Sequence, residues 1–255
     1  MSHNILYKTV LVTGAAHRIG KAVALSLARD GWAVAVHYNR SAEAAFALVD
    51  EIIAAGAQAV ALQADLASED DVLTLVPRAV EALGPLGCLV NNASLFEQDS
   101  ALTATRASWD AHMETNLRAP FVLTQSFAAQ LPEESEGLVV NLIDQRVWNL
   151  TPHFTTYTLS KAGLWALTQT LALALAPRIR VNAVAPGPTL PSIRQTQEQF
   201  DQQCAAMPLR RGTSPEEIAE AVRFTINAGA MTGQLIALDG GQHLCWAPAG
   251  NTPEE

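Results

Sequence analysis

A tyrosine and a lysine on one expected helical face, with an aspartate upstream, could together transfer a proton. Tyr157 and Lys161 are four residues apart, so on a helix both side chains project from the same face. An ammonium beside a phenol lowers the pKa of the phenol and makes it a usable acid near neutral pH. Asp144 precedes Tyr157 by 13 residues, at the end of an apolar run. By itself this spacing also fits a solvated lysine beside a half-buried tyrosine.

A glycine-containing turn follows the first apolar run. Gly14 and Gly20 bracket the turn in the segment Thr13-Gly-Ala-Ala-His-Arg-Ile-Gly20. Gly14 permits a tight turn, Gly20 permits close approach at a helix start, and the N–H groups there suit a pyrophosphate. An ordinary strand-to-helix turn is the alternative. The position, after the first strand and opening the first helix, favours nucleotide binding.

The end of the second predicted strand bears on which nucleotide is bound. An NAD site usually has Asp or Glu here for the ribose hydroxyls, whereas this chain has Arg40 and Ser41. A guanidinium and a hydroxyl suit a 2′-phosphate, which favours NADPH. The alternative is a solvated arginine. Asp65, after the third strand, could accept from the adenine amino group or cap its own loop.

Two asparagine-containing segments place polar groups near the expected crevice. Asn92, Ala93 and Ser94 follow the fourth strand, and small polar residues at a strand's carboxyl end face the ligand, although an asparagine turn is the alternative. Asn116 interrupts an apolar helical pattern. Such a residue needs a partner, so we expect either a local backbone bond or a water network.

The chain alternates apolar strands with helical patterns almost throughout, which predicts a parallel sheet covered by helices on both faces. The expected strands are Tyr7–Thr13, Ala33–Tyr38, Ala57–Gln63, Cys88–Val90, Leu138–Ile143, Ile179–Val184 and Leu235–Leu238. The expected helices are Ile19–Asp30, Ser41–Ala55, a helix capped by Ser68 and ending near Leu83, Ser108–Leu131, Thr155–Ala176, and one opening at Ser214-Pro-Glu-Glu217. The segment from Thr189 to about Met207 is expected to be a polar substrate loop.

Composition limits the class of protein. The 255 residues are 49% hydrophobic and 16% charged, as in a well-packed globule, and the net charge of -9 disfavours nucleic acid as a partner. Three scattered cysteines lack metal-ligand spacing and are interpreted as intracellular thiols, so no metal is expected. We expect neither a signal peptide nor a membrane span, and therefore a cytoplasmic protein.

Together these motifs resemble the short-chain dehydrogenase/reductase family over essentially the whole chain. The segments TGAAHRIG, NNAS, ETNLRAP, YTLSK, VNAVAPG and LDGG occur in family order and spacing. The resemblance implies one doubly wound domain over 1–255, with a dinucleotide-binding part at about 5–150, a catalytic and substrate-loop part at about 140–245, a frayed tail at 248–255, and a homotetramer. It implies cofactor contacts at Gly14, Arg18, Ile19, Gly20, His37, Tyr38, Asn39, Arg40, Ser41, Asp65, Leu66, Asn92, Ala93, Ser94, Tyr157, Lys161, Pro186 and Gly187.

Within that family the chain is most similar to the pteridine reductases. Arg18 stands where most members have glycine, Ser94 where many have glycine, and Asp144 where the family normally has a catalytic serine. Phe96 matches an aromatic residue that stacks on the pterin ring. The resemblance implies substrate contacts at Arg18, Ser94, Phe96, Asp144 and Tyr157.

The resemblance also implies a mechanism. Tyr157 would donate a proton, Lys161 would hold the nicotinamide ribose, Asn116 would anchor a water chain, and Asp144 would assist proton delivery to a C=N bond. The favoured expectation is therefore an NADPH-dependent pterin reductase. The alternatives are an NADPH-dependent reductase of a ketone, sugar or acyl thioester, and a non-catalytic NADPH-binding regulator, which the intact Tyr157, Lys161 and Asn116 disfavour.

Overall fold

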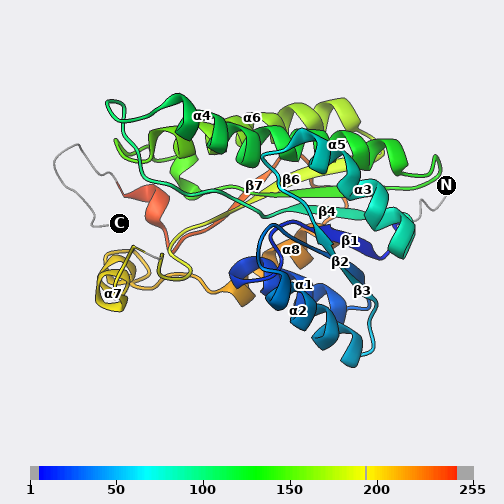
Figure 1. Cartoon of the computed structure of the whole chain (residues 1–255). Coiled ribbons are helices and arrows are strands. Elements are labelled where there is room, and N and C mark those ends of the chain that lie inside the picture. Colours follow the sequence, from blue (N-terminus) through cyan, green and yellow to red (C-terminus); the bar gives the residue numbers. More distant parts are fainter. Residues whose placement is uncertain (1–5, 193, 246–255) are drawn as a thin grey trace.

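The computed structural model describes residues 6–192 and 194–245, which form a single α/β domain (Figure 1). Seven parallel strands make one sheet in the order β3-β2-β1-β4-β5-β6-β7. The strands are β1 (Thr9–Val12), β2 (Ala33–Tyr38), β3 (Ala59–Gln63), β4 (Cys88–Asn91), β5 (Gly137–Leu142), β6 (Ile179–Pro186) and β7 (Leu235–Leu238). The predicted fold class, a sheet of about seven parallel strands covered on both faces, is confirmed.

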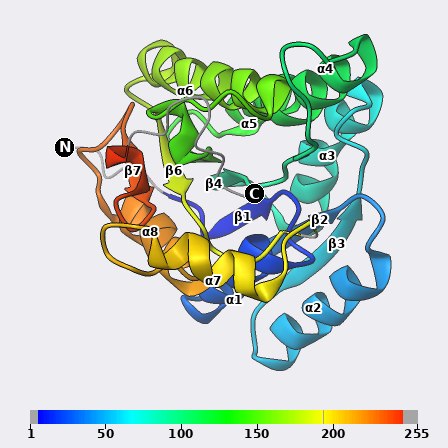
Figure 2. The ribbon, with the colours of Figure 1, turned by 90° about the vertical axis from the view of Figure 1, so that its left-hand side faces the viewer.

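Helices cover both faces of the sheet (Figure 2). The helices are α1 (Arg18–Arg29), α2 (Ala42–Ala54), α3 (Glu69–Leu83), α4 (Arg106–Met113), α5 (Ala119–Gln130), α6 (Thr155–Leu175), α7 (Gln197–Ala205) and α8 (Pro215–Asn227). The apolar faces of α1, α2 and α8 pack in one core cluster, and those of α3, α5 and part of α6 pack in another on the opposite face. The central strands are buried on both sides, which explains their continuous apolar sequences. None of the helices described is long and apolar enough to cross a membrane.

The helix expected at Ser108–Leu131 is not one regular helix. It consists of α4, a π-helical turn at Glu114–Arg118, and α5. The periodicity of apolar residues shows a helical stretch but does not reveal where one extra residue enters a turn.

The expected substrate loop is also partly wrong, because residues Gln197–Ala205 form α7. This helix buries none of its residues and lies apart from both helical layers, at one end of the sheet (Figures 1 and 2). It therefore lacks the apolar stripe by which a packed helix is recognised. Thr196 and Gln199 form a capping box at its start, and that pair was the available sequence signal.

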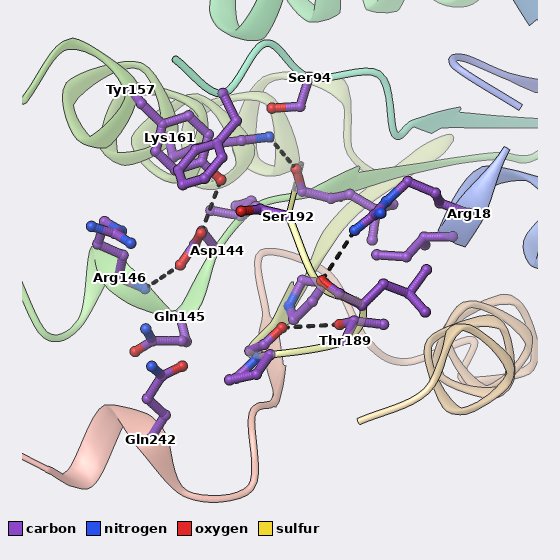
Figure 3. Close-up of a pocket in the computed structure, with 18 of the residues that line it drawn as sticks. Arg18, Ser94, Asp144, Gln145, Arg146, Tyr157, Lys161, Thr189, Ser192 and Gln242 are labelled. Carbon is purple, nitrogen blue, oxygen red and sulfur yellow. Dashed lines mark hydrogen bonds between the residues drawn. The ribbon is translucent and has the colours of Figure 1, made fainter. Parts of the chain in front are cut away.

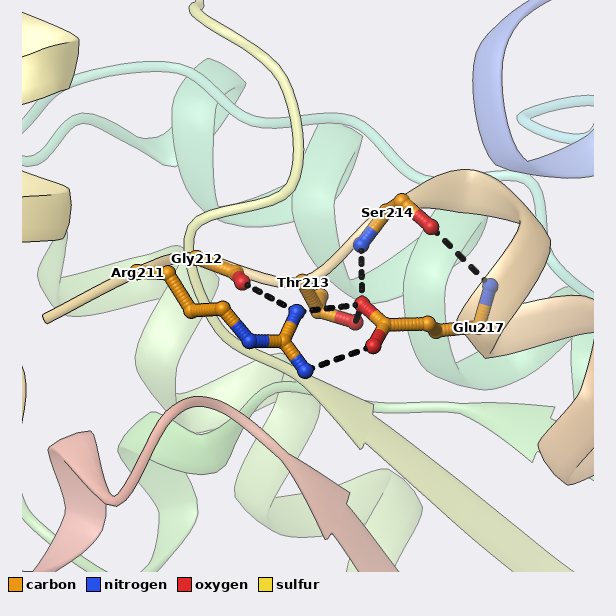
Figure 4. Close-up of polar contacts among 5 residues, drawn as sticks. All are labelled: Arg211, Gly212, Thr213, Ser214 and Glu217. Atoms are coloured by element: carbon orange, nitrogen blue, oxygen red, sulfur yellow. Dashed lines mark hydrogen bonds and ion pairs between the residues drawn. The ribbon is translucent and has the colours of Figure 1, made fainter. Parts of the chain in front are cut away.

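The start of α8 is fixed by the local bonds that its sequence predicts (Figure 4). The Ser214 hydroxyl accepts from the Glu217 N–H at 3.1 Å, and the Glu217 carboxylate accepts from the Ser214 N–H at 2.9 Å. Arg211 pairs with the same carboxylate, and this bond lowers the pKa of Glu217 to about 2. Helix α8 therefore begins directly after Ser214, the N-cap residue that the sequence predicted.

The sheet order creates a crevice at one point. Strand β1 pairs with both β2 and β4, so the connections leaving β1 and β4 diverge to opposite faces of the sheet. The carboxyl ends of these strands carry the glycine turn and the Asn92 segment. The crevice between them is where ligands bind in open α/β sheets.

Candidate active site

The glycine turn is held from the neighbouring strand ends. Gly14 has φ +60°, in the left-handed region that glycine tolerates. The Asn92 side-chain amide donates to the carbonyls of Thr13 and Gly14 at 2.8 and 3.1 Å. A Cβ at Gly20 would lie 2.3 Å from the Gly14 carbonyl oxygen and 2.6 Å from Asn92 Nδ2. Only glycine therefore fits at position 20 of this turn.

His37, on β2, holds the glycine turn through a hydrogen bond to its backbone. The Gly14 N–H donates to His37 Nδ1 at 3.0 Å, so Nε2 carries the ring proton and donates to the Ala64 carbonyl at 3.1 Å. Burial of the ring lowers its pKa to about 4, and the imidazole is neutral. Both ring nitrogens are thus engaged within the protein, which makes His37 a support of the predicted cofactor site.

A cavity of about 620 Å³ lies over the turn and the ends of β2 to β4. It brings together most of the predicted cofactor residues: Gly14, Arg18, Ile19, Gly20, His37, Asn39, Arg40, Asp65, Leu66, Asn92, Ala93 and Ser94. Asp65 accepts from the Asn39 side chain at 3.2 Å and from the Ala67 N–H at 3.0 Å, so it caps its own loop as well as lining the cavity.

Six predicted cofactor residues do not line this cavity. Tyr157, Lys161, Pro186 and Gly187 line an adjoining cavity, whereas Tyr38 and Ser41 line neither. The Tyr38 ring packs against Phe46 with centroids 6.1 Å apart. Ser41 is the residue before α2, and its side chain forms no cap bond. The sequence placed both at a strand end but could not show which way each side chain points.

Tyr157 and Asp144 meet directly in a second, adjoining cavity of about 250 Å³ (Figure 3). The Tyr157 hydroxyl donates to Asp144 Oδ2 at 2.9 Å. The other carboxylate oxygen, Oδ1, accepts from the Arg146 N–H at 2.8 Å and caps the short 3₁₀ turn Gln145–Val147. Asp144 therefore caps this turn and accepts from Tyr157 at the same time, and its catalytic role stays a prediction.

Lys161 lies one helical turn after Tyr157, as predicted. Its ammonium is buried, donates to the Leu142 carbonyl at 2.8 Å and lies 5.8 Å from the centre of the Tyr157 ring. Burial lowers the pKa of Lys161 to about 8, although the nearby Asp144 carboxylate opposes that shift. Because this pKa still lies above neutral pH, the side chain keeps its positive charge near the phenol inside the protein.

Asn116 is fully buried in the π-helical turn. Its side-chain oxygen accepts from the Leu95 N–H at 2.8 Å, and its amide donates to the Leu95 carbonyl at 2.9 Å and to the Ser160 hydroxyl at 3.0 Å. The partners are therefore not local in the chain. They are the backbone after β4, 21 residues away, and a hydroxyl on the helix that carries Tyr157.

Phe96 lies against Tyr157 and Phe154. Its ring stacks on Phe154 with centroids 4.4 Å apart and meets the Tyr157 ring edge-on at 4.7 Å. Phe96 and Ser94 both line the second cavity. The aromatic and hydroxyl groups predicted for substrate contact therefore line the same cavity as Tyr157.

Arg18 reaches across from the glycine turn to the loop after β6. Its guanidinium donates to the carbonyls of Leu190 and Pro191 at 3.1 and 3.0 Å. Its backbone has φ +54°, a region that costs a non-glycine residue about 1–2 kcal/mol. Arg18 lines both cavities, while its contact with phosphates or pterin stays a prediction.

The predicted substrate loop supplies part of the remaining lining of the second cavity, through Thr189, Ser192, Gln195 and Gln203. Pro186 and Gly187, predicted as cofactor contacts, also line it. The residues with no role predicted from the sequence include Gln145, Arg146 and Gln242, which come from two other segments that the fold brings to the cavity. Trp148 is 45% exposed and packs edge-on against His243, with centroids 5.2 Å apart.

The family model for short chain dehydrogenases matches residues 8–202. The chain belongs to this family. FolM alternative dihydrofolate reductase 1 from Brucella suis, solved in complex with NADP, is 50% identical with a TM-score of 0.92, over 96% of this chain and 98% of that one. A short chain dehydrogenase from Burkholderia cenocepacia, also solved with NADP, is 36% identical with a TM-score of 0.86, over 93% and 99% of the two chains.

A curated sequence relative carries a different name. The 3-oxoacyl-[acyl-carrier-protein] reductase FabG of Staphylococcus epidermidis is 35% identical over 242 residues, which cover 93% of this chain and 99% of that protein. Members of the family with different named activities therefore resemble this chain along almost its whole length.

Proposed function

We propose that the protein is an NADPH-dependent reductase of pterins that transfers a hydride to a C=N bond. The observation that carries this proposal is the 2.9 Å hydrogen bond from the Tyr157 hydroxyl to Asp144 Oδ2. It pairs the proton donor with a carboxyl group where the resembling family has a serine hydroxyl. The proposal is also supported by the 50% sequence identity to the Brucella suis protein, which is named an alternative dihydrofolate reductase.

The cofactor is NADP(H), and the residues of the first cavity fit it. The N–H groups of the glycine turn suit the pyrophosphate, and Arg40 at the end of β2 suits a 2′-phosphate. The absence of a side chain at Gly20, where a Cβ would meet Asn92, keeps the turn compact enough for close approach. Bound NADPH would supply the hydride.

The chain's own residues handle the proton. Tyr157 holds it on the phenol oxygen, next to Asp144, and the buried Lys161 ammonium favours the phenolate that remains after transfer. A nitrogen of a C=N bond takes up a proton as the hydride adds. An ionised Asp144 would repel the negative charge that develops on a carbonyl oxygen, so the pair suits nitrogen better than oxygen.

Phe96 supports a flat substrate. Its ring is fixed by stacking on Phe154 and by the edge contact with Tyr157. An aromatic ring held beside the proton donor can pack on a planar heterocycle and orient it.

Reduction of a ketone, sugar or acyl thioester is the second candidate, and the likeness to FabG favours it. In that case Asp144 would orient Tyr157. Purified protein is assayed for NADPH oxidation with dihydrobiopterin and with a panel of ketones and acyl thioesters. Faster turnover of the dihydropterin is expected. Turnover of ketones alone would replace the proposal by the second candidate, and oxidation with none of them would favour the binding regulator.

A further inference from the structure

Four glutamine side chains line the cavity that contains Asp144 and Tyr157. They are Gln145, Gln195, Gln203 and Gln242. The Gln195 side-chain amide donates to Gln203 Oε1 at 2.9 Å, and Gln195 Oε1 accepts from the Ser192 N–H at 3.1 Å. Gln195 is therefore engaged in holding its own loop. Gln145 and Gln242 come from elsewhere, on the 3₁₀ turns Gln145–Val147 and Gln242–Leu244.

The side-chain oxygen of Gln145 is a buried acceptor without a hydrogen-bond partner among the residues described. The residue as a whole is only 6% exposed. Leaving a buried acceptor unpaired costs about 1–3 kcal/mol. A site that retains such a group can recover that cost when a ligand donates a hydrogen bond.

The position of this amide relates it to the reacting groups. Gln145 follows Asp144 directly in the chain, and its side chain extends toward Gln242 on the side of Asp144 away from Tyr157 (Figure 3). Gln242 is half-buried and lines the same cavity, and a ligand can contact the Gln145 oxygen only after the side chains that cover this oxygen move. A substrate whose reacting bond lies at Tyr157 and Asp144 would reach this amide pair with a substituent.

We propose that Gln145, assisted by Gln242, determines substrate specificity by accepting a hydrogen bond from an uncharged O–H or N–H group on the substituent beyond the reacting bond. This inference rests on the proposed reduction at the Tyr157–Asp144 pair. An alkyl or acyl chain placed there leaves the Gln145 oxygen unpaired, and a carboxylate offers it no donor. A site with such a group rejects analogues that lack the donor more strongly than an apolar pocket would.

The test compares dihydropterins that differ only in the substituent at position 6. Dihydrobiopterin carries hydroxyl groups, and 6-methyl-dihydropterin lacks them. We expect kcat/KM for dihydrobiopterin to exceed that for the methyl compound by about tenfold. Gln145→Met keeps the side-chain length and removes the amide, so it should lower only the dihydrobiopterin value and bring the two within about threefold. Gln242→Met should cause a smaller change in the same direction.

Gln197→Met is the matched control, because Gln197 is exposed on α7, donates to Asp201 and does not line the cavity. Its ratio of the two kcat/KM values should equal that of the unmodified protein. NADPH titration and thermal unfolding establish that each variant is folded. Equal losses on both dihydropterins in Gln145→Met, or equal use of both by the unmodified protein, would overturn the inference.

Failure of the proposed function gives a different result. The unmodified protein would then oxidise NADPH with a ketone but with neither dihydropterin. The same variants would be compared on a hydroxylated ketone and its deoxy analogue, where an unchanged ratio in Gln145→Met rejects the role of Gln145 independently.

Discussion

Asp144 uses its two carboxylate oxygens for different partners. One accepts from the Arg146 N–H and fixes the turn, and the other accepts from the Tyr157 hydroxyl. A serine at this position has one oxygen and could not make both bonds in the same way. The residue thereby joins the backbone after β5 to the Tyr157 hydroxyl on α6.

Asp144→Asn tests the carboxyl with little change in shape. We expect it to lower kcat for the dihydropterin by about 100-fold, the contribution of a positioned acid or base, while NADPH still binds. The measurement is steady-state turnover together with NADPH titration by fluorescence. Tyr157→Phe provides the reference for loss of the proton donor. Turnover of Asp144→Asn close to that of the unmodified protein would reduce Asp144 to a turn cap.

Arg40→Asp tests the choice of cofactor. The unmodified protein should prefer NADPH to NADH by at least about tenfold in kcat/KM, roughly 1.4 kcal/mol. A carboxylate at this position would repel the 2′-phosphate and could hold ribose hydroxyls, so the preference should vanish or reverse. The values are measured with both cofactors at saturating substrate. Equal use of NADPH and NADH by the unmodified protein would contradict the role of Arg40.

The residue types around Tyr157 were predictable because each stands out chemically from its neighbours in the chain. The spacing of Tyr157 and Lys161, the acidic Asp144 and the buried Asn116 all stand out from an apolar background. Gln145 does not stand out in this way. What distinguishes Gln145 is that its buried side-chain oxygen lacks a hydrogen-bond partner among the described residues, and this depends on which residues the fold places around it.

Helix α8 shows how local chemistry sets an element. Ser214→Ala removes the acceptor for the Glu217 N–H and should lower the free energy of unfolding by about 1 kcal/mol. Urea unfolding followed by circular dichroism gives this value. Ser214→Asp keeps an acceptor and serves as the control, for which we expect near-normal stability. Equal losses in both variants would show that the cap bond is not the cause.

Elements were predicted well where a packed face marks them. Strand β2 has the predicted bounds, and α6 ends one residue before the prediction, because apolar periodicity and breakers coincide there. Helix α7 was missed because it packs no apolar face. The reach of Arg18 to Leu190 and Pro191 was also unpredictable, since it joins residues more than 170 positions apart.

At the scale of the whole molecule, the two cavities adjoin one another and share Arg18, Ile19, Asn92 and Ser94. Residues from the glycine turn to Thr115 line the first, and residues from Leu142 to Gln242 complete the second. The predicted division into parts at about 5–150 and 140–245 follows the same arrangement and stays a proposal. So do the homotetramer, which light scattering can test, and the cytoplasmic location. The predicted frayed tail at 248–255 lies outside the described residues.

The stability of the molecule should depend on pH through His37. Its pKa in the folded protein, about 4, lies below the ordinary value of 6.5, so the unfolded chain binds more protons between these values. The contribution of His37 to the free energy of unfolding is fully present above pH 6.5. It falls by about 3 kcal/mol as the pH drops toward 4. Chemical unfolding across this range measures it. His37→Gln should flatten the profile, and an unchanged slope would assign the effect elsewhere.

The π-helical turn at Glu114–Arg118 has a consequence for how this chain can change over time. Each residue added to a helix rotates everything after it by about 100°. Losing one residue between α4 and α5 would therefore turn the buried side chains of α5 away from the sheet, or else turn Asn116 away from Leu95 and Ser160. Point substitutions can accumulate in this stretch, whereas a single-codon deletion would damage folding and the site together. Its length should consequently be far more constant among descendants than its composition.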